Sequence, residues 1–281
     1  MKKMLLSLAH PDDESFAAGG TVAKYSRNGW DITLLVVTNG EKGARGEFQW
    51  AQGEALGALR QKETEQAAKI LGIKTVEFLG YPDGKLSGVH HGDLEDKISS
   101  SIEKYAPDIV ITHDPTGMNN HPDHIRVCYA TTFAFQKYAR SLHDLQFPQG
   151  RCGRRSLSYL KAEQVNLSQV PETRGDPKLY YTCLPKSVVS YLQKKSIFIQ
   201  EAFGKRLSGI DDDRITTVID IKRTRSAKVK ALSCHETQKA HVETFLSLPH
   251  NPQLQQEYFL LRMQGVLEVF MGKRDTIAIS L

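Results

Sequence analysis

Short apolar runs alternate with longer amphipathic stretches along the first half of the chain. The apolar runs are Met4–Ala9, Asp31–Thr38, Thr75–Leu79 and Asp108–Thr112. Continuous runs of this length are typical of parallel strands that are buried on both faces. The stretches between and after them have helical periodicity, and they are Glu14–Asn28, Glu54–Leu71, Asp93–Tyr105 and His121–Arg140.

This alternation predicts an α/β fold, because strands separated by helices form βαβ units with helices on both faces of the sheet. We expect a Rossmann-like, doubly wound and mostly parallel sheet. In the C-terminal half the pattern predicts further strands and helices, but it does not predict the order of these strands in the sheet. The strands expected there are Leu179–Thr182, Thr216–Ile221 and Val266–Phe270, and the helices are Ser187–Phe198 and Ser226–Gln238.

One long segment breaks the pattern. The range His143–Pro177 is rich in Arg, Gln, Pro and Gly and has only weak periodicity. Connections of this length in a compact domain are usually functional or mobile. We therefore predict one domain over residues 1–281, in which 143–177 is an irregular insertion or a lid near the active site. A plain oligomer contact is the alternative for this segment.

Composition and charge narrow the class of protein. The chain has 281 residues, of which 40% are hydrophobic and 25% charged, as in ordinary globular proteins. Its net charge of +5 is small. The densest basic run, 222–230, contains no interleaved aromatic residue, so we interpret it as a solvated helix face and expect no nucleic-acid partner.

The cysteines and the hydropathy suggest a compartment. The four cysteines form no C-x-x-C pair, and we interpret them as reduced thiols of a cytoplasmic protein. No run approaches the roughly 20 apolar residues that a membrane-spanning helix needs. We therefore expect no membrane span.

Two similar motifs, His10-Pro-Asp-Asp13 and His121-Pro-Asp-His124, occur where a predicted strand gives way to a predicted helix. Proline is favoured at the first helical position, and residues three apart project to the same side of a helix. In open α/β sheets, functional crevices lie beyond the carboxyl ends of the strands. The first and fourth residues of each motif can therefore point at one place.

Three histidines and three aspartates at that edge form a candidate metal site, because a catalytic zinc typically takes three N or O ligands and leaves a position for water. The alternative for either motif alone is a helix N-cap, in which Asp accepts backbone N–H bonds. Two copies at equivalent places make that alternative weaker. Glu14 is the exception, since a glutamate in the first turn commonly serves the helix macrodipole.

The sequence also resembles a known family. Ala9-His-Pro-Asp-Asp-Glu14, Gly19-Gly20 and the second motif are similar to the PIG-L/LmbE family of N-deacetylases, which remove acyl groups from glucosamine-containing compounds. Other parts agree with this resemblance, and they are Arg60–Glu63, Phe78–Gly84, Lys230–Leu232 and His235–Gln238. The resemblance spans roughly Met4 to Gln238.

The resemblance implies a zinc ion, with another divalent metal such as Fe²⁺ as the alternative. The implied ligands are His10, Asp13 and His124. The implied catalytic residues are Asp12 as the general base, His121 as the group that stabilises the oxyanion or protonates the leaving amine, and Asp123 as the residue that orients His121.

Three more residues are expected near the substrate: Arg60, Asp83 and Asn119. The alternative for Arg60, of equal weight, is a pair with Glu63 one helical turn away. Asp83 lies in Pro-Asp-Gly and is also a good turn former. Asn119 stands where some family members have a tyrosine, and its amide reaches less far. We expect His235 to lie in the wall of the site without touching the substrate.

These residues predict a metal-dependent amide hydrolase that uses zinc-activated water. The resemblance implies that it removes an N-acetyl group from a small glucosamine-containing molecule. The first alternative is a thiol-conjugate, mycothiol-type amidase that cleaves a larger amide. A catalytically silent sugar- or metal-binding module is disfavoured, because Asp12 and His121 are both present. By analogy with the family we carry a homo-oligomer as an expectation. An anionic or polar aglycone is expected from the charge excess together with Arg151, Arg154 and Arg155.

Overall fold

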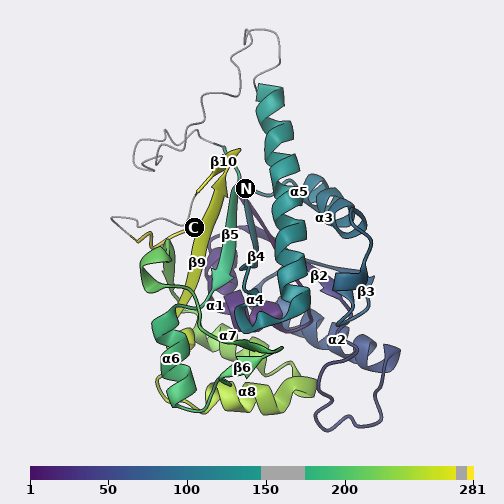
Figure 1. Ribbon diagram of the computed structural model, residues 1–281, viewed down its shortest axis with the longest axis vertical. Helices are drawn as coiled ribbons and strands as arrows, with labels where there is room; N and C mark the ends of the chain where they lie inside the picture. The colour runs from purple at the N-terminus through teal and green to yellow at the C-terminus, as the bar shows by residue number, and fades with distance from the viewer. Residues whose placement is uncertain (147–174, 270–276) are drawn as a thin grey trace.

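The computed structural model describes residues 1–146, 175–269 and 277–281 (Figure 1). The α-helices are α1 Asp13–Arg27, α2 Glu54–Leu71, α3 Asp93–Tyr105, α4 Gly117–Asn120, α5 Pro122–Gln146, α6 Lys186–Lys194, α7 Arg225–Leu232 and α8 Lys239–Leu246. The strands are β1 Lys3–Leu8, β2 Asp31–Thr38, β3 Thr75–Tyr81, β4 Ile109–His113, β5 Lys178–Cys183, β6 Glu201–Ala202, β7 Lys205–Arg206, β8 Thr217–Asp220, β9 Gln256–Gln264 and β10 Leu267–Glu268. Within these ranges, no helix is both long and apolar enough to cross a membrane.

Eight of the described strands form one sheet, in the order β10-β9-β5-β4-β1-β2-β3, with β8 paired to β9. β1 runs parallel to both β2 and β4, and β5 runs parallel to β4. The chain therefore builds one side of the sheet from β1 to β3 and then returns to build the other side from β4. This reversal makes the boundary between β1 and β4 the switch point at which such sheets bind ligands. The predicted α/β fold with a mostly parallel sheet is confirmed.

Helices cover both faces of the sheet, because successive residues of a buried strand point to opposite faces. Leu6 of β1 belongs to an apolar cluster that includes residues of α1, α2 and α7. Its neighbour Leu5 belongs to a second cluster, which includes residues of α3 and α5. Figure 1 shows α3 and α5 together on one side of the strands.

The C-terminal half differs from the sequence prediction. The strand expected over Val266–Phe270 is formed only in part, as β10 at Leu267–Glu268, and Phe270 lies outside the described residues. The long strand of this region is β9, which pairs with β5, β8 and β10. The helix expected over Ser226–Gln238 ends at Leu232, and α8 follows it. Strand β9 was not predicted because its sequence does not alternate regularly between apolar and polar residues. One of its polar residues, Glu257, is buried.

A buried ion pair explains this glutamate. It also corrects the interpretation of the basic run at one position, Lys228, whereas the other basic residues of the run are exposed as expected. Lys228 of α7 is fully buried, and its Nζ lies 2.6 Å from Oε1 of Glu257. The two carboxylate oxygens of Glu257 also accept the backbone N–H groups of Gly20 and Thr21. Gly20 is required there, because a Cβ would come within 2.6 Å of Ile221. Thus α1, α7 and β9 are joined at one point.

The segment proposed as an insertion is only partly described. Helix α5 continues through Gln146, so the first residues of 143–177 are helical. The rest of the range to 174, including Arg151, Arg154 and Arg155, lies outside the described residues. The single domain and the lid stay predictions.

Replacing Lys228 by Met should lower the free energy of unfolding by about 3–5 kcal/mol, because Glu257 would then be a buried charge without its cation. The matched control is Lys230→Met in the same helix, where the lysine is exposed and the change should be within about 0.5 kcal/mol. Urea denaturation of the two variants measures the difference. Equal stability of both would contradict the importance of the buried pair.

Candidate active site

The predicted site residues gather at the carboxyl ends of β1 and β4. His10 lies two residues after β1, while the second motif begins α5 close behind β4. A cavity of about 800 Å³ opens there. Eight of the nine predicted site residues line it: His10, Asp12, Asp13, Arg60, Asp83, Asn119, His121 and His124. The two motifs, 111 positions apart, therefore share one site, as their spacing and topology predict.

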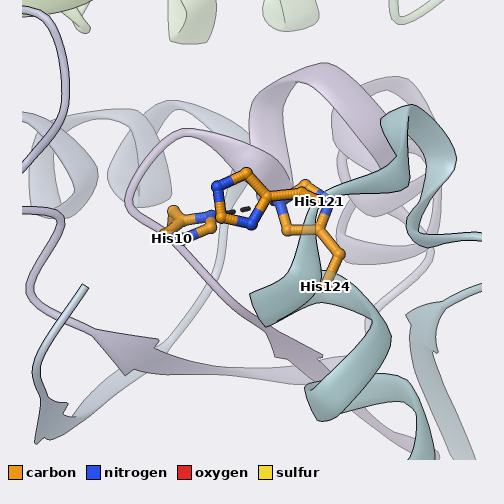
Figure 2. Close-up of side chains that lie close together, drawn as sticks. All are labelled: His10, His121 and His124. Atoms are coloured by element: carbon orange, nitrogen blue, oxygen red, sulfur yellow. Dashed lines mark hydrogen bonds between the residues drawn. The ribbon is translucent and has the colours of Figure 1, made fainter. Parts of the chain in front are cut away.

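The three predicted metal ligands converge. Nδ1 of His10 lies 3.0 Å from Nε2 of His124. Asp13 lies 3.7 Å from that His10 nitrogen through Oδ2 and 3.4 Å from that His124 nitrogen through Oδ1. Tetrahedral ligand atoms at zinc distances of about 2.0–2.1 Å lie roughly 3.3 Å apart. Figure 2 shows the rings of His10, His121 and His124 grouped together, with the contact between His10 and His124 marked.

The second nitrogen of each ligand ring is held by a different partner. Nε2 of His10 lies 3.1 Å from Oδ1 of Asp83 and 3.4 Å from Oδ2 of Asp123. Nδ1 of His124 lies 3.1 Å from the carbonyl oxygen of Gly117. Partners of this kind fix ring orientation and tautomer in metal sites. With these partners in place, Nδ1 of His10 and Nε2 of His124 are the nitrogens that face each other and are available to bind a metal ion.

The charge balance of the cluster fits a cation at this point. Burial disfavours the charged ring of His10, yet Asp123 and Asp83 raise its pKa to about 10. Burial acts against the charge of Asp13 as well, but His124 and His113 hold the pKa of its carboxyl well below the usual range. A metal would have to displace the His10 proton, and such proton release is usual for metal binding. The donor set therefore fits a divalent metal with N and O ligands.

Overlapping clusters in the described ranges offer further ligands. They are His10 with His121 and His124; Asp13 with His113 and His124; and His10 with Asp83 and Asp123. His113 was not singled out from the sequence. Its Nε2 lies 3.3 Å from Oδ2 of Asp13, and its ring stacks on His124 at 4.0 Å. The signal in the sequence that could have identified His113 is its position at the carboxyl end of β4, at the edge of the sheet where the two motifs lie.

Asp12 has an unusual backbone that directs its carboxylate into the cavity. Its φ of 106° lies in a region that costs a residue other than glycine of order 1–3 kcal/mol. Its backbone N–H donates to Oε2 of Glu14, and its carbonyl oxygen accepts N–H groups from Ser15 and Phe16. Burial raises the pKa of the Asp12 carboxyl to about 6, although Arg60 acts in the opposite direction. A pKa near neutrality suits a general base.

Two residues support Asp12, and one of them, Glu14, has another role than the one expected. Glu14 is fully buried, and Nε2 of His235 lies 2.9 Å from its Oε1, so Glu14 anchors the motif instead of serving the macrodipole at the surface. Arg60 donates to Oδ2 of Asp12 at 3.0 Å and to the carbonyl oxygens of Pro11 and Gly40. The expected alternative, a pair with Glu63, is not formed, because Glu63 accepts two bonds from Thr237.

The second motif requires one correction. Asp123 was expected to orient His121, but its carboxylate accepts N–H groups from Gly84 and Leu86 and faces His10. The reason is local, since those two N–H groups hold the buried carboxylate beside His10. The backbone N–H of Asp123 instead donates to Nδ1 of His121 at 3.2 Å. This bond leaves Nε2 of His121 to carry the proton.

The remaining substrate candidates differ in role. Asp83 lines the cavity, but its carboxylate contacts His10 and the backbone N–H of Lys42. Asn119 is exposed on the cavity wall, and its Oδ1 accepts the N–H of His121, so its amide N–H groups face outward as donors. His235 is buried behind Glu14 and is not among the residues that line the cavity, so the expectation that it lies in the wall of the site is wrong.

With this geometry established, similarity to known proteins decides the family. Residues 5–135 match PIG-L, the GlcNAc-PI de-N-acetylase family. The chain is 30% identical, over 98% of its own length and 94% of the relative, to 1D-myo-inositol 2-acetamido-2-deoxy-alpha-D-glucopyranoside deacetylase of Rhodococcus jostii (strain RHA1). This chain belongs to the PIG-L family. The family resemblance predicted from the sequence is thereby confirmed.

Solved structures of lower identity share the fold of this PIG-L chain. N,N'-diacetylchitobiose deacetylase from Pyrococcus horikoshii has a TM-score of 0.61 and 21% identity, over 94% of this chain and 85% of that one. GalB, the 4-carboxy-2-hydroxymuconate hydratase of Pseudomonas putida KT2440, has a TM-score of 0.59 and 18% identity, over 96% and 100%. Because the two proteins catalyse different reactions, the fold alone does not decide the chemistry.

Replacing Gly43 by Ala should displace Arg60 from Asp12, because a Cβ at Gly43 would overlap Nη1 of the guanidinium. The matched control is Gly88→Ala, where a Cβ meets nothing within 4 Å. Misplacement of a reacting group by about 1 Å can cost on the order of 100-fold. We expect kcat for amine release from an N-acetylglucosamine conjugate to fall by about tenfold or more in Gly43→Ala only. Equal rates in the two variants would show that Arg60 does not position Asp12.

Proposed function

We propose that this PIG-L chain is a metal-dependent N-deacetylase that hydrolyses the N-acetyl amide of a small glucosamine-containing substrate. The metal is zinc, held by His10, Asp13 and His124. The observation that supports it most directly is the convergence of these three side chains beside Asp12 in one cavity. The Rhodococcus relative, named for deacetylation of a glucosamine-inositol compound, supports the substrate class.

Hydrolysis of an amide needs an activated nucleophile, stabilisation of the tetrahedral oxygen and a proton for the leaving amine. When bound, zinc supplies a Lewis acid and lowers the pKa of water. The chain supplies the base, because the carboxylate of Asp12 faces the cavity and is held by Arg60. We assign to Asp12 the proton that leaves the attacking water.

On the other side of the ligand cluster, His121 supplies a proton donor. Since its Nδ1 accepts a backbone N–H, the proton resides on Nε2, where it can be donated to the carbonyl oxygen or to the amine nitrogen. Asn119 is placed beside it as a further donor to the substrate. Asp123 and Asp83 are positioning residues in this proposal, because they act on His10 and not on the substrate.

The direct test is incubation of the purified, metal-loaded protein with a panel of N-acetylglucosamine conjugates, followed by measurement of primary amine. Release of the amine together with free acetate is the expected result. If metal-loaded protein released no amine from any glucosaminide, the deacetylase proposal would be wrong. Release only from conjugates with a larger acyl group would favour the amidase.

His10→Ala and His124→Ala should each lose the bound metal, because the remaining two ligands cannot complete the N and O set that zinc prefers. His241→Ala is the matched control, since His241 lines the cavity but lies outside the ligand clusters. Elemental analysis after gel filtration should give about one metal per chain in the control and wild-type proteins. Full occupancy in both ligand variants would show that the ligands are misassigned.

Asp12→Asn should keep the metal and lose activity, because an amide cannot take the proton of water. General base catalysis typically contributes about 10²–10⁴-fold, so we expect kcat to fall within that range. The substitution also alters the bond from Arg60 to Asp12. The metal content and the thermal stability of the same preparation are therefore measured, to show that the fold and the metal site are intact. A metal-replete Asp12→Asn protein with a nearly normal kcat would remove Asp12 from the mechanism.

A further inference from the structure

The cavity has two chemically different halves. The metal ligands and their carboxylate partners line one part. A second group of lining residues is mostly apolar, although the polar His241, Thr244 and Gln253 also line the cavity. The apolar members are Phe16, Met118, Leu184, Ile197, Phe198, Ile199, Phe203, Leu207 and Phe245. These residues come from α1, α4, α8 and the segment between β5 and β8. Figure 1 shows α6, the β6–β7 hairpin and α8 gathered at one end of the molecule. The deacetylation proposed above uses none of them.

Two of these residues are exposed to solvent although they are large and apolar. The exposed fractions are 64% for Ile199 and 57% for Phe203. Both line the cavity, so they stand over a concave surface. Covering such side chains with a hydrocarbon group is favourable by about 25 cal/mol for each Å² removed from water. The exposed apolar surface of Ile199 and Phe203 would therefore stabilise a bound ligand that carries a hydrocarbon group.

The placement of Phe203 goes against local preference. The two-residue turn between β6 and β7 is Phe203-Gly204, and both residues have positive φ, 52° and 70°. Turns of this kind favour Asn-Gly or Asp-Gly, and a bulky residue at the first position is costly. The Phe203 ring nevertheless stands there, with its centroid 4.8 Å from that of His121. Departures from local preference of this kind are typical of functional positions.

The hairpin is held in place by the second motif. Nδ2 of Asn120 donates to the carbonyl oxygen of Lys205 at 3.0 Å and also reaches those of Ala202 and Arg206. Asn120 directly precedes His121. The turn that presents Phe203 is therefore fixed to the same backbone that positions the proposed proton donor.

From this arrangement we propose that the substrate bears a hydrocarbon group, alkyl or aryl, which binds in the apolar half of the cavity against Phe203 and Ile199. The inference rests on the proposed function for the identity of the sugar, but the apolar subsite is a separate claim. It is an alternative to the anionic or polar aglycone expected from the sequence, which stays a prediction because Arg151, Arg154 and Arg155 lie outside the described residues. The cationic side chains Lys42 and Arg60 also line the cavity, but both lie at the metal end, since Arg60 is bound to Asp12 and the Lys42 ammonium lies against Gly84.

The hydrocarbon could be attached at either of two places on the sugar, and the assay separates them. One arm compares methyl and hexyl glycosides of N-acetylglucosamine in both anomeric forms. The other compares N-acetyl with N-hexanoyl glucosamine. Each methylene that becomes fully buried contributes up to about fourfold. We expect kcat/KM to rise at least about tenfold in one arm, and the arm that responds identifies the attachment. Equal values in both arms, or faster hydrolysis of an anionic glycoside, would overturn the proposal.

Phe203→Asn tests the hairpin directly. Asparagine suits the positive φ of this turn, so the variant should be as stable as the wild type or more so. The preference for the hexyl compound should nevertheless fall about threefold to tenfold. Phe133→Asn is the matched control, because Phe133 has a similar exposed fraction, 53%, and lies outside the cavity. An unchanged preference in Phe203→Asn would overturn the placement of the hydrocarbon against the hairpin.

Binding measurements separate this inference from the proposed reaction. Calorimetric titration of the metal-loaded Asp12→Asn protein gives the apolar preference with turnover suppressed. The titration uses both pairs of compounds, the methyl and hexyl glycosides and the N-acetyl and N-hexanoyl glucosamines, and amine release is measured separately with the wild-type protein. Tighter binding of the hexyl compound, without amine release, would support the subsite and count against the deacetylase. Amine release with equal affinity within both pairs of compounds would support the deacetylase and overturn the subsite.

Discussion

The pairing of β1 with β4 at the switch point is the constraint on which the site depends. Met4 to Ser7 lie in parallel register with Ile109 to Thr112, so the two strands end side by side. The segments that follow them then lead into helices on opposite faces of the sheet. The crevice between them receives one motif from each strand, and neither motif supplies all three proposed ligands. A register shift of one residue would turn the strand side chains to the other face and separate the motifs.

Around this crevice the buried charged side chains are paired with groups of opposite charge. The carboxylates of Asp83 and Asp123 face His10, and Arg60 faces Asp12. Unpaired buried charges are costly, so each charged group near the ligands needs such a partner. Backbone N–H groups complete the balance, as at Asp123, and Glu14 holds the strained backbone of Asp12 in the same way. The positioning of His10 and Asp12 thus depends on residues from four separate parts of the chain.

The sequence predicted the parts of this arrangement that depend on local pattern. The buried strands, the two motifs and their meeting at one edge follow from periodicity and from the topology of α/β sheets. The partners of the site residues were not predictable in the same way. Asp123 turns toward His10, and Lys228 is buried, because of contacts with Gly84 and Glu257 that are distant in sequence. No periodicity in a single sequence reports such contacts.

The division of the cavity also divides the chain. The proposed ligands, base and proton donor come from the N-terminal half, where rigid parallel strands end in short turns. Most of the apolar wall comes from residues after β5, including the small β6–β7 hairpin. Reacting groups need placement within a fraction of an ångström, whereas a hydrocarbon needs only a dry surface of suitable shape. The two halves meet at Asn120, whose side chain donates to a carbonyl oxygen of the hairpin, and at His121, whose ring contacts Phe203.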